Sequence, residues 1–237
     1  MAVEELVLPV VESVIPEAVA GLIREADRRI DHLFESGQTR RFPRFIPSDA
    51  ALFYFTLAHL TGRDLPLGRR FCEWGSGLGV GTCIASLLGY EAYGIEIEPE
   101  LARRSRELAR ELAIDVQILC TSYIPDGLDS FSGQGGTDIV AFDDYSSPGD
   151  AGGWGSWGRG SGGAFEPAYE GMGADLAEID VFYVYPWPGE QEFMQKLFDI
   201  VAVEGAILIA YHGDGEMCIF RKICDPGTDD DSLDSIE

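Results

Sequence analysis

Basic residues are scarce in this chain of 237 residues, which has 17 lysines and arginines against 41 acidic residues. The formal net charge is −24 at pH 7. Nucleic acids and anionic membrane surfaces are polyanions, so we expect neither to be the main partner. The cluster of Arg40, Arg41 and Arg44 is a local exception, and a solvated loop is its simplest interpretation.

Cysteines are also few, and long apolar runs are missing. The five cysteines are odd in number and form no CxxC pair, which argues against a disulfide framework and favours a reducing compartment. The first residues lack the basic segment of a signal peptide, and no apolar run reaches membrane-spanning length. We therefore expect a cytoplasmic protein.

Helical periodicity dominates the first quarter of the chain. Between residues 17 and 35, apolar side chains recur every three or four positions along one stripe. A second helix is expected over residues 49–60, with Ser48 as a capping residue. We interpret residues 1–66 as an N-terminal helical extension.

Strands and helices then alternate from residue 67 to residue 224. Such alternation indicates a parallel sheet with helices on both faces. The predicted fold is α/β and Rossmann-like: a doubly wound, mostly parallel sheet of about six strands behind the N-terminal helical extension. The predicted strands are 69–74, 90–97, 115–121, 180–186, 206–211 and 217–223, and the predicted helices are 80–89, 100–113 and 190–201.

Two segments fall outside this alternation. Residues 126–174 are rich in Gly, Ser and Asp, which predicts a flexible insertion, or alternatively a lid that carries Trp154 and Trp157. Within it, residues 137–147 compete with 180–186 for the fourth strand, and we favour 180–186 because a helix follows it directly. Residues 225–237 are predicted to be an acidic disordered tail.

Glycines alternate with other residues in "FCEWGSGLGVGT", residues 71–82. Glycine permits positive φ and bares the backbone, and the helix that follows offers free N–H groups to a ligand. The dinucleotide spacing G-x-G-x-x-G fails here, because the sixth position from Gly75 is Val80. An NAD(P)-dependent oxidoreductase is therefore an alternative rather than the first choice.

The pattern E-x-G-x-G-x-G from Glu73 to Gly79, followed by Glu96 at the end of the next predicted strand, resembles the class I S-adenosylmethionine-dependent methyltransferases. The resemblance implies S-adenosyl-L-methionine as cofactor, with Glu73 near its amino group and Glu96 on the ribose hydroxyls. It also implies that Ser122 lies near the adenine. The cofactor-binding residues expected from it are Glu73, Gly75, Ser76, Gly77, Gly79, Glu96, Ile97, Ser122, Tyr123 and Tyr185.

The chain departs from that family at two places. The sequence Tyr185-Pro186-Trp187-Pro188 lacks the acid or amide that amine methyltransferases often carry after the fourth strand. The segment between the last two strands is too short for the family's usual helix and extra strand, which is why we expect a sheet of about six strands.

No catalytic residue is assigned from the sequence. The candidates near the transferred methyl group are Tyr185 and Trp187, which could wall the pocket, and His212, which could accept a proton. We expect no metal site, since Asp143, Asp144 and Asp150 have no histidine partner nearby and are interpreted as solvated loop acids. The function expected for residues 67–224 is methyl transfer to a small-molecule or protein acceptor. A non-catalytic binding module that retains the fold is the second alternative.

Overall fold

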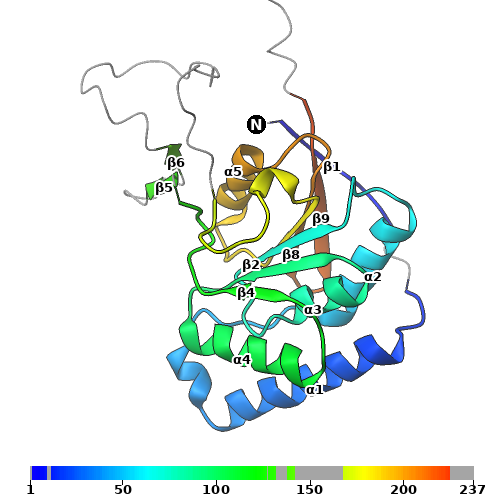
Figure 1. Ribbon diagram of the computed structural model, residues 1–237, viewed down its shortest axis with the longest axis vertical. Coiled ribbons are helices and arrows are strands. Elements are labelled where there is room, and N and C mark those ends of the chain that lie inside the picture. The colour runs from blue at the N-terminus through cyan, green and yellow to red at the C-terminus, as the bar shows by residue number, and fades with distance from the viewer. Residues whose placement is uncertain (1, 10–11, 127, 132–137, 142–167, 225–237) are drawn as a thin grey trace, which may run out of the picture.

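A seven-stranded sheet forms the centre of the computed structural model, which describes residues 2–9, 12–126, 128–131, 138–141 and 168–224 (Figure 1). Strands β4, β3, β2, β7 and β8 run parallel, β9 runs antiparallel to β8, and β1 runs antiparallel to β9. In spatial order the strands are β1 (Val3–Glu5), β9 (Glu216–Lys222), β8 (Ile207–Gly213), β7 (Val181–Val184), β2 (Arg70–Trp74), β3 (Glu91–Ile95) and β4 (Gln117–Leu119).

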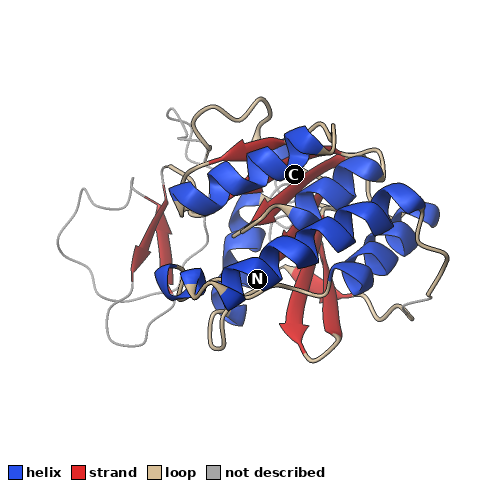
Figure 2. Ribbon diagram, turned by 90° about the horizontal axis from the view of Figure 1, so that it is seen from below, coloured by secondary structure: helices blue, strands red, loops and turns tan. Residues whose placement is uncertain are grey.

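Helices cover both faces of this sheet (Figures 1 and 2). Alternate strand residues point to opposite faces, so Phe71 and Tyr183 pack against α1 to α4, whereas Cys72 and Phe182 pack against α5. This arrangement confirms the predicted Rossmann-like α/β fold. The helices are α1 (Glu17–Glu35), α2 (Ala50–Gly62), α3 (Val80–Leu87), α4 (Pro99–Glu111) and α5 (Gln191–Val201), with short 3-10 turns η1 (Gln38–Arg41) and η3 (Leu176–Glu178).

The fourth parallel strand is β7, as predicted from residues 180–186. The competing segment supplies β6 (Asp138–Ala141), which pairs with β5 (Leu128–Phe131) in a separate two-stranded sheet. The helix after β7 begins seven residues beyond the strand, and β8 follows it. The β7–α5–β8 unit therefore completes the parallel sheet.

The sheet has seven strands where about six were expected, and the additional strand is β1. β8 and β9 are joined by a tight turn with no helix or strand between them, which agrees with the short segment seen in the sequence. The free edge of β9 is instead paired with β1, where Val3 lies opposite Lys222 and Glu5 opposite Phe220. An unpaired edge strand exposes its N–H and C=O groups, and β1 covers them. The N-terminal extension is therefore not purely helical.

Two further predictions need correction. Asp49 rather than Ser48 caps α2, because its carboxylate accepts the N–H of Leu52 at 2.9 Å. The boundary of the insertion at residue 174 was placed too late, since Tyr169 is buried and its hydroxyl donates to the carbonyl of Tyr123. Trp154, Trp157, Asp143, Asp144, Asp150 and the tail 225–237 lie outside the described residues.

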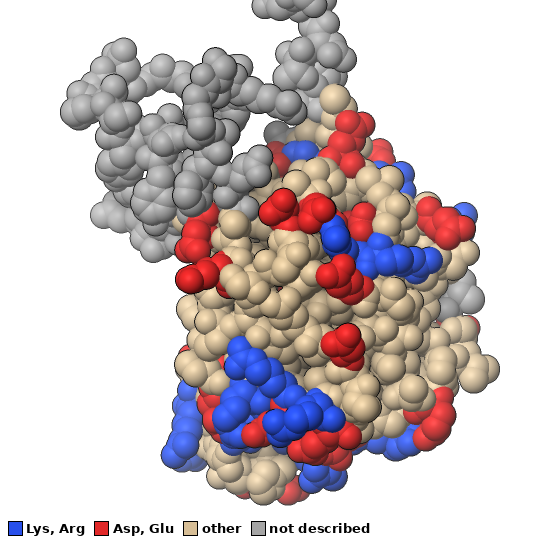
Figure 3. Space-filling view, viewed as in Figure 1, with Lys and Arg blue, Asp and Glu red and all other residues tan. Residues whose placement is uncertain are grey.

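Charged side chains of both signs lie together over α1 and α4 (Figure 3). Arg29 contacts Glu25 at 2.7 Å and Glu111 at 2.6 Å, and Arg103 contacts Glu100 at 2.8 Å. The arginines on this face are thus interleaved with glutamates. None of the helices in the described part of the chain is long and apolar enough to cross a membrane.

Candidate functional site

The glycine loop between β2 and α3 has a backbone conformation that favours glycine. Gly75, Gly77 and Gly79 have φ angles of +71°, +55° and +70°, in the left-handed region. A Cβ atom on Gly77 would lie 2.9 Å from the ring of Phe45, and one on Gly79 would lie 2.0 Å from Oγ of Ser105. The loop is therefore shaped by backbone conformation and by close neighbours together.

Glu73, at the end of β2, is fixed by the first turn of α3. Its Oε2 accepts the N–H of Thr82 at 2.7 Å and the hydroxyl of Thr82 at 2.5 Å. A Cβ on Gly81 would lie 2.6 Å from Oε1, so glycine at that position lets the carboxylate reach the helix. Glu73 is 6 % exposed, and burial raises its pKa to about 7. Within the described residues Oε1 has no hydrogen-bond partner.

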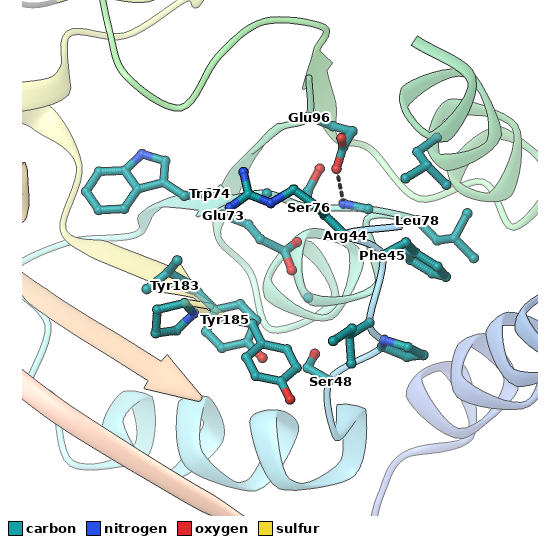
Figure 4. A pocket seen from close by; sticks show the side chains of 18 of the residues that line it. Arg44, Phe45, Ser48, Glu73, Trp74, Ser76, Leu78, Glu96, Tyr183 and Tyr185 are labelled. Atoms are coloured by element: carbon teal, nitrogen blue, oxygen red, sulfur yellow. Dashed lines mark hydrogen bonds between the residues drawn. The ribbon is translucent and has the colours of Figure 1, made fainter. Parts of the chain in front are cut away.

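Glu96, just after β3, joins the glycine loop to the entrance of α4. Its Oε2 accepts the N–H of Gly77 at 2.7 Å (Figure 4). Its Oε1 accepts the N–H of Glu98 at 2.8 Å. The side chain is 6 % exposed, and burial raises its pKa. Each carboxylate oxygen has a second lone pair, so both oxygens can still accept a hydrogen bond from a ligand.

Both carboxylates line one cavity of about 420 Å³ at the carboxyl ends of β2, β3 and β7. This is the edge at which open α/β sheets bind ligands. Most of the residues expected from the sequence meet here. Those that line the cavity are Glu73, Gly75, Ser76, Gly77, Glu96, Ile97, Tyr123, Tyr185, Trp187 and His212.

The structure places two expected residues away from the cavity lining. Gly79 faces Ser105 of α4 and allows that helix to pack closely against the loop. The hydroxyl of Ser122 accepts the N–H of Ile124 at 3.1 Å, within its own turn. Their roles toward the cofactor stay predictions.

Residues 42–48, which we call the strap, form a wall that the sequence analysis did not identify residue by residue. Phe45 covers Gly77, and Ser48 lies on the same side of the cavity as Tyr183 and Tyr185 (Figure 4). The strap joins α1 to α2 by way of η1, so its position depends on packing between segments far apart in the chain. Its two prolines and two phenylalanines are the only local signal of an ordered loop.

Arg44 connects the strap to the loop after β7. Its guanidinium forms an ion pair with Glu190, with Nη2 and Oε1 2.6 Å apart. The same group lies 5.5 Å from the centre of the Trp187 ring, within the range of a cation–π contact. The strap thus reaches the side of the cavity formed by the β7–α5 loop.

Two buried polar atoms of residues that line the cavity have no hydrogen-bond partner in the described residues. They are Oγ of Ser76 and Nε2 of His212. Buried polar groups are nearly always paired, so two unpaired atoms at one cavity fit a site for a polar ligand. Burial raises the pKa of Tyr183, which keeps its hydroxyl protonated at neutral pH.

Aromatic rings form the wall beyond Glu73. Tyr185 packs edge-on against Tyr211 with ring centres 4.7 Å apart, and Tyr123 packs against Phe193 at 6.4 Å. Tyr123, Tyr185 and Trp187 line the cavity, whereas Phe193 and Tyr211 pack against the first two of these rings. The cavity lining therefore combines carboxylates with aromatic rings. The described residues hold no cluster of His, Cys, Asp or Glu that could bind a metal ion.

No protein-family model and no curated protein matches this chain. Among solved structures, an RNA methyltransferase from Salinibacter ruber in complex with S-adenosyl-L-homocysteine is similar over 75 % of this chain and 94 % of its own, with 15 % identity and a TM-score of 0.46. A 16S rRNA methyltransferase from T. thermophilus in complex with AdoMet and guanosine is similar over 76 % of this chain and 44 % of its own, with 11 % identity and a TM-score of 0.47.

A third similar structure is a S-adenosylmethionine-dependent methyltransferase from Clostridium acetobutylicum, with 8 % identity and a TM-score of 0.43. The match covers 78 % of this chain and 56 % of that one, so the chain spans about half the length of some of these proteins. The strand order itself, five parallel strands followed by an antiparallel hairpin strand, is that of a Rossmann-like α/β fold.

Proposed function

We propose that the cavity binds S-adenosyl-L-methionine and that the protein transfers its methyl group to an acceptor. One observation carries the proposal: two buried carboxylates, Glu73 and Glu96, are held at one cavity by backbone N–H groups of the glycine loop and of α3. The cofactor carries an ammonium group and a vicinal diol, and both are hydrogen-bond donors that suit carboxylate acceptors.

Each carboxylate has an oxygen suited to one of these groups. Oε1 of Glu73 has no hydrogen-bond partner in the described residues and would accept the ammonium group. The remaining lone pairs of Glu96 would accept the ribose hydroxyls. Ile97 and Tyr123 would flank the adenine, and the unpaired hydroxyl of Ser76 would donate to the amino-acid part of the cofactor.

The bound cofactor supplies a methyl group activated by a positively charged sulfur. A lone pair of the acceptor forms the new bond to the methyl carbon, while the electron pair of the breaking carbon–sulfur bond goes to sulfur. The acceptor then releases a proton to water or to Nε2 of His212. Tyr185 and Trp187 would exclude bulk water and hold the acceptor in line, which is most of what such a transfer requires.

Calorimetry with S-adenosyl-L-methionine tests the proposal on the parent chain and on Glu96→Ala. We expect the variant to lose at least tenfold in affinity, because it removes charge-assisted hydrogen bonds worth about 1.5–3 kcal/mol. Glu107→Ala is the matched control, since Glu107 is a partly exposed acid of α4 that pairs with Arg103. Unchanged affinity in Glu96→Ala would remove the ribose assignment.

Two further measurements separate the alternatives. Preferential binding of NADH over S-adenosyl-L-methionine would favour an NAD(P)-dependent oxidoreductase. Tight binding of the cofactor with no transfer of a labelled methyl group to any acceptor in a broad screen would favour a binding module.

A further inference from the structure

We propose that Trp187 and Glu190 form a subsite for a cation at the mouth of the cavity, and that the methyl acceptor carries a primary ammonium group on an alkyl chain. The inference rests on the proposed function and names the class of acceptor. The structure supplies a stand-in for this group, since the chain's own Arg44 places its guanidinium over the Trp187 ring and against the Glu190 carboxylate.

A rigid turn holds the two residues of the subsite together. The N–H of Glu190 donates to the carbonyl of Trp187 at 2.8 Å, and Gly189 between them has a φ of +91°. Pro188 followed by a glycine with positive φ is the pattern of a type II turn, which fixes the backbone. The ring and the carboxylate therefore meet an incoming cation in a defined arrangement.

The guanidinium of Arg44 can move away from Trp187 and Glu190. Its side chain is 67 % exposed, and an ion pair of this kind contributes little to stability. Glu190 is more enclosed, with 26 % of its side chain exposed, and Trp187 is half-buried. Removal of Arg44 would leave a ring face and a carboxylate, which is the arrangement that attracts a cation.

The chemistry of transfer favours an ammonium over a guanidinium. A guanidinium stays protonated in proteins and its nitrogen lone pairs are delocalised. An alkylammonium has no lone pair either, but it can release one proton to water. The neutral amine then attacks the methyl carbon, the carbon–sulfur bond breaks toward sulfur, and the product is a methylated ammonium. The product is a cation again, so it still fits Trp187 and Glu190.

The net charge of the chain also favours an acceptor that carries an ammonium group. With a net charge of −24, the protein attracts cations and repels anionic acceptors at long range. Long-range attraction is not selective, however, and any polycation would benefit from it. The test must therefore compare ligands that differ in a single group, at an ionic strength near 0.15 M, where the screening length is about 8 Å.

The experiment measures binding of N-acetyl-lysine methylamide and of its norleucine analogue, which lacks the ammonium, by calorimetry with and without S-adenosyl-L-homocysteine. We expect the parent chain to bind the lysine derivative at least fivefold more tightly. Trp187→Ala and Glu190→Gln should remove this preference. Arg44→Ala should increase affinity for the lysine derivative about two- to fivefold, because the internal competitor is gone. Glu192→Gln is the matched control, since Glu192 is an exposed acid of α5 that pairs with Lys196.

Equal binding of the two ligands by the parent chain would overturn the inference. So would a loss of lysine-derivative binding in Arg44→Ala, or equal effects of Glu190→Gln and Glu192→Gln. Affinity for S-adenosyl-L-homocysteine, measured in the same samples, tests the proposed function separately. Spermidine and a short lysine peptide, added as further ligands, distinguish a free amine from a polypeptide side chain as the source of the ammonium.

Discussion

Oε2 of Glu96 accepts the N–H of Gly77 at 2.7 Å, so a carboxylate that follows β3 holds the loop that follows β2. The same side chain also accepts the N–H of Glu98. Glu96 therefore has a structural task in addition to the proposed contact with the ribose. Any test of the cofactor site has to separate these two tasks.

The free energy of unfolding measures the structural task of Glu96 separately from its proposed contact with the ribose. Glu96→Ala leaves two backbone N–H groups without their acceptor, at a cost of about 1–3 kcal/mol for each one that stays dry. Glu96→Gln keeps one acceptor oxygen, and we expect it to cost about half as much. Urea denaturation measures both values. Equal destabilisation by the two variants would contradict the role given to the hydrogen bonds.

Gly75 and Gly79 form a matched pair for the glycine loop. Both have positive φ, but a Cβ on Gly75 meets nothing within 4 Å, whereas one on Gly79 meets Ser105. Gly75→Ala should cost about 1–2 kcal/mol of backbone strain alone. Gly79→Ala should cost about 1–3 kcal/mol more, because it also overpacks the contact with α4.

Ser105→Ala provides the control for Gly79→Ala. The hydroxyl of Ser105 is buried without a partner, so its removal should have little effect in the parent chain. In the double variant it should recover about 1 kcal/mol or more, since the closest clash involves Oγ. Additive effects in this double-mutant cycle would show that the contact with Ser105 does not limit the loop.

The raised pKa of Glu73 predicts a pH dependence with a definite sign. An ammonium ligand requires the carboxylate, whereas the free protein holds the proton until the pH reaches about 7. Affinity for S-adenosyl-L-homocysteine should therefore rise roughly tenfold between pH 6 and pH 7.5, with release of a proton. Calorimetry in buffers of different ionisation enthalpy measures both quantities.

Stability without ligand should follow the opposite trend. Between the usual value of 4.5 and about 7, the folded chain binds more protons at Glu73 than the unfolded chain does. This carboxyl therefore lowers the free energy of unfolding as the pH rises through that interval. Glu73→Gln should remove the contribution of Glu73 to the pH dependence of ligand affinity and of the free energy of unfolding. The contribution of Glu96, whose pKa is also raised by burial, should remain. Identical pH profiles for the parent and Glu73→Gln would disprove the assignment.

The pairing of the N-terminal segment with β9 is tested at Leu6, whose N–H donates to the carbonyl of Ile219 at 2.7 Å. Leu6→Pro removes this donor, and Leu6→Ala keeps it while losing the same apolar side chain. We expect Leu6→Pro to unfold at a lower urea concentration, with an additional loss of about 1–3 kcal/mol relative to Leu6→Ala. Equal midpoints would mean that the pairing does not stabilise the sheet.

Local patterns were sufficient to predict the centre of the fold and much of the candidate site. The unit from β2 through the glycine loop to α3 can be recognised from the sequence, because an apolar strand, alternating glycines and a helix follow one another directly. Glu96 could be placed beside it, since the carboxyl ends of neighbouring parallel strands lie at one edge of the sheet.

What the sequence analysis missed depends on contacts between distant segments. Strand β1 has only three residues, too few for an alternating pattern to be recognised. The contact of Gly79 with Ser105 depends on how closely α4 approaches the loop, and the contact of Arg44 with Glu190 depends on how the strap crosses the cavity. Neither contact produces a periodic pattern of residues in the sequence.

The pairing of β1 with β9 also constrains how the chain folds. Strand β1 can pair only after residues 220–222 have taken their place in β9. This pairing at the edge of the sheet closes a loop of more than 200 residues, from Glu5 to Phe220. Contacts so distant in sequence carry a large loop-closure entropy and slow folding. During synthesis, residues 3–5 emerge from the ribosome long before residues 220–222, so β1 would pair late, and until then the edge of β9 would stay open to pairing with another chain.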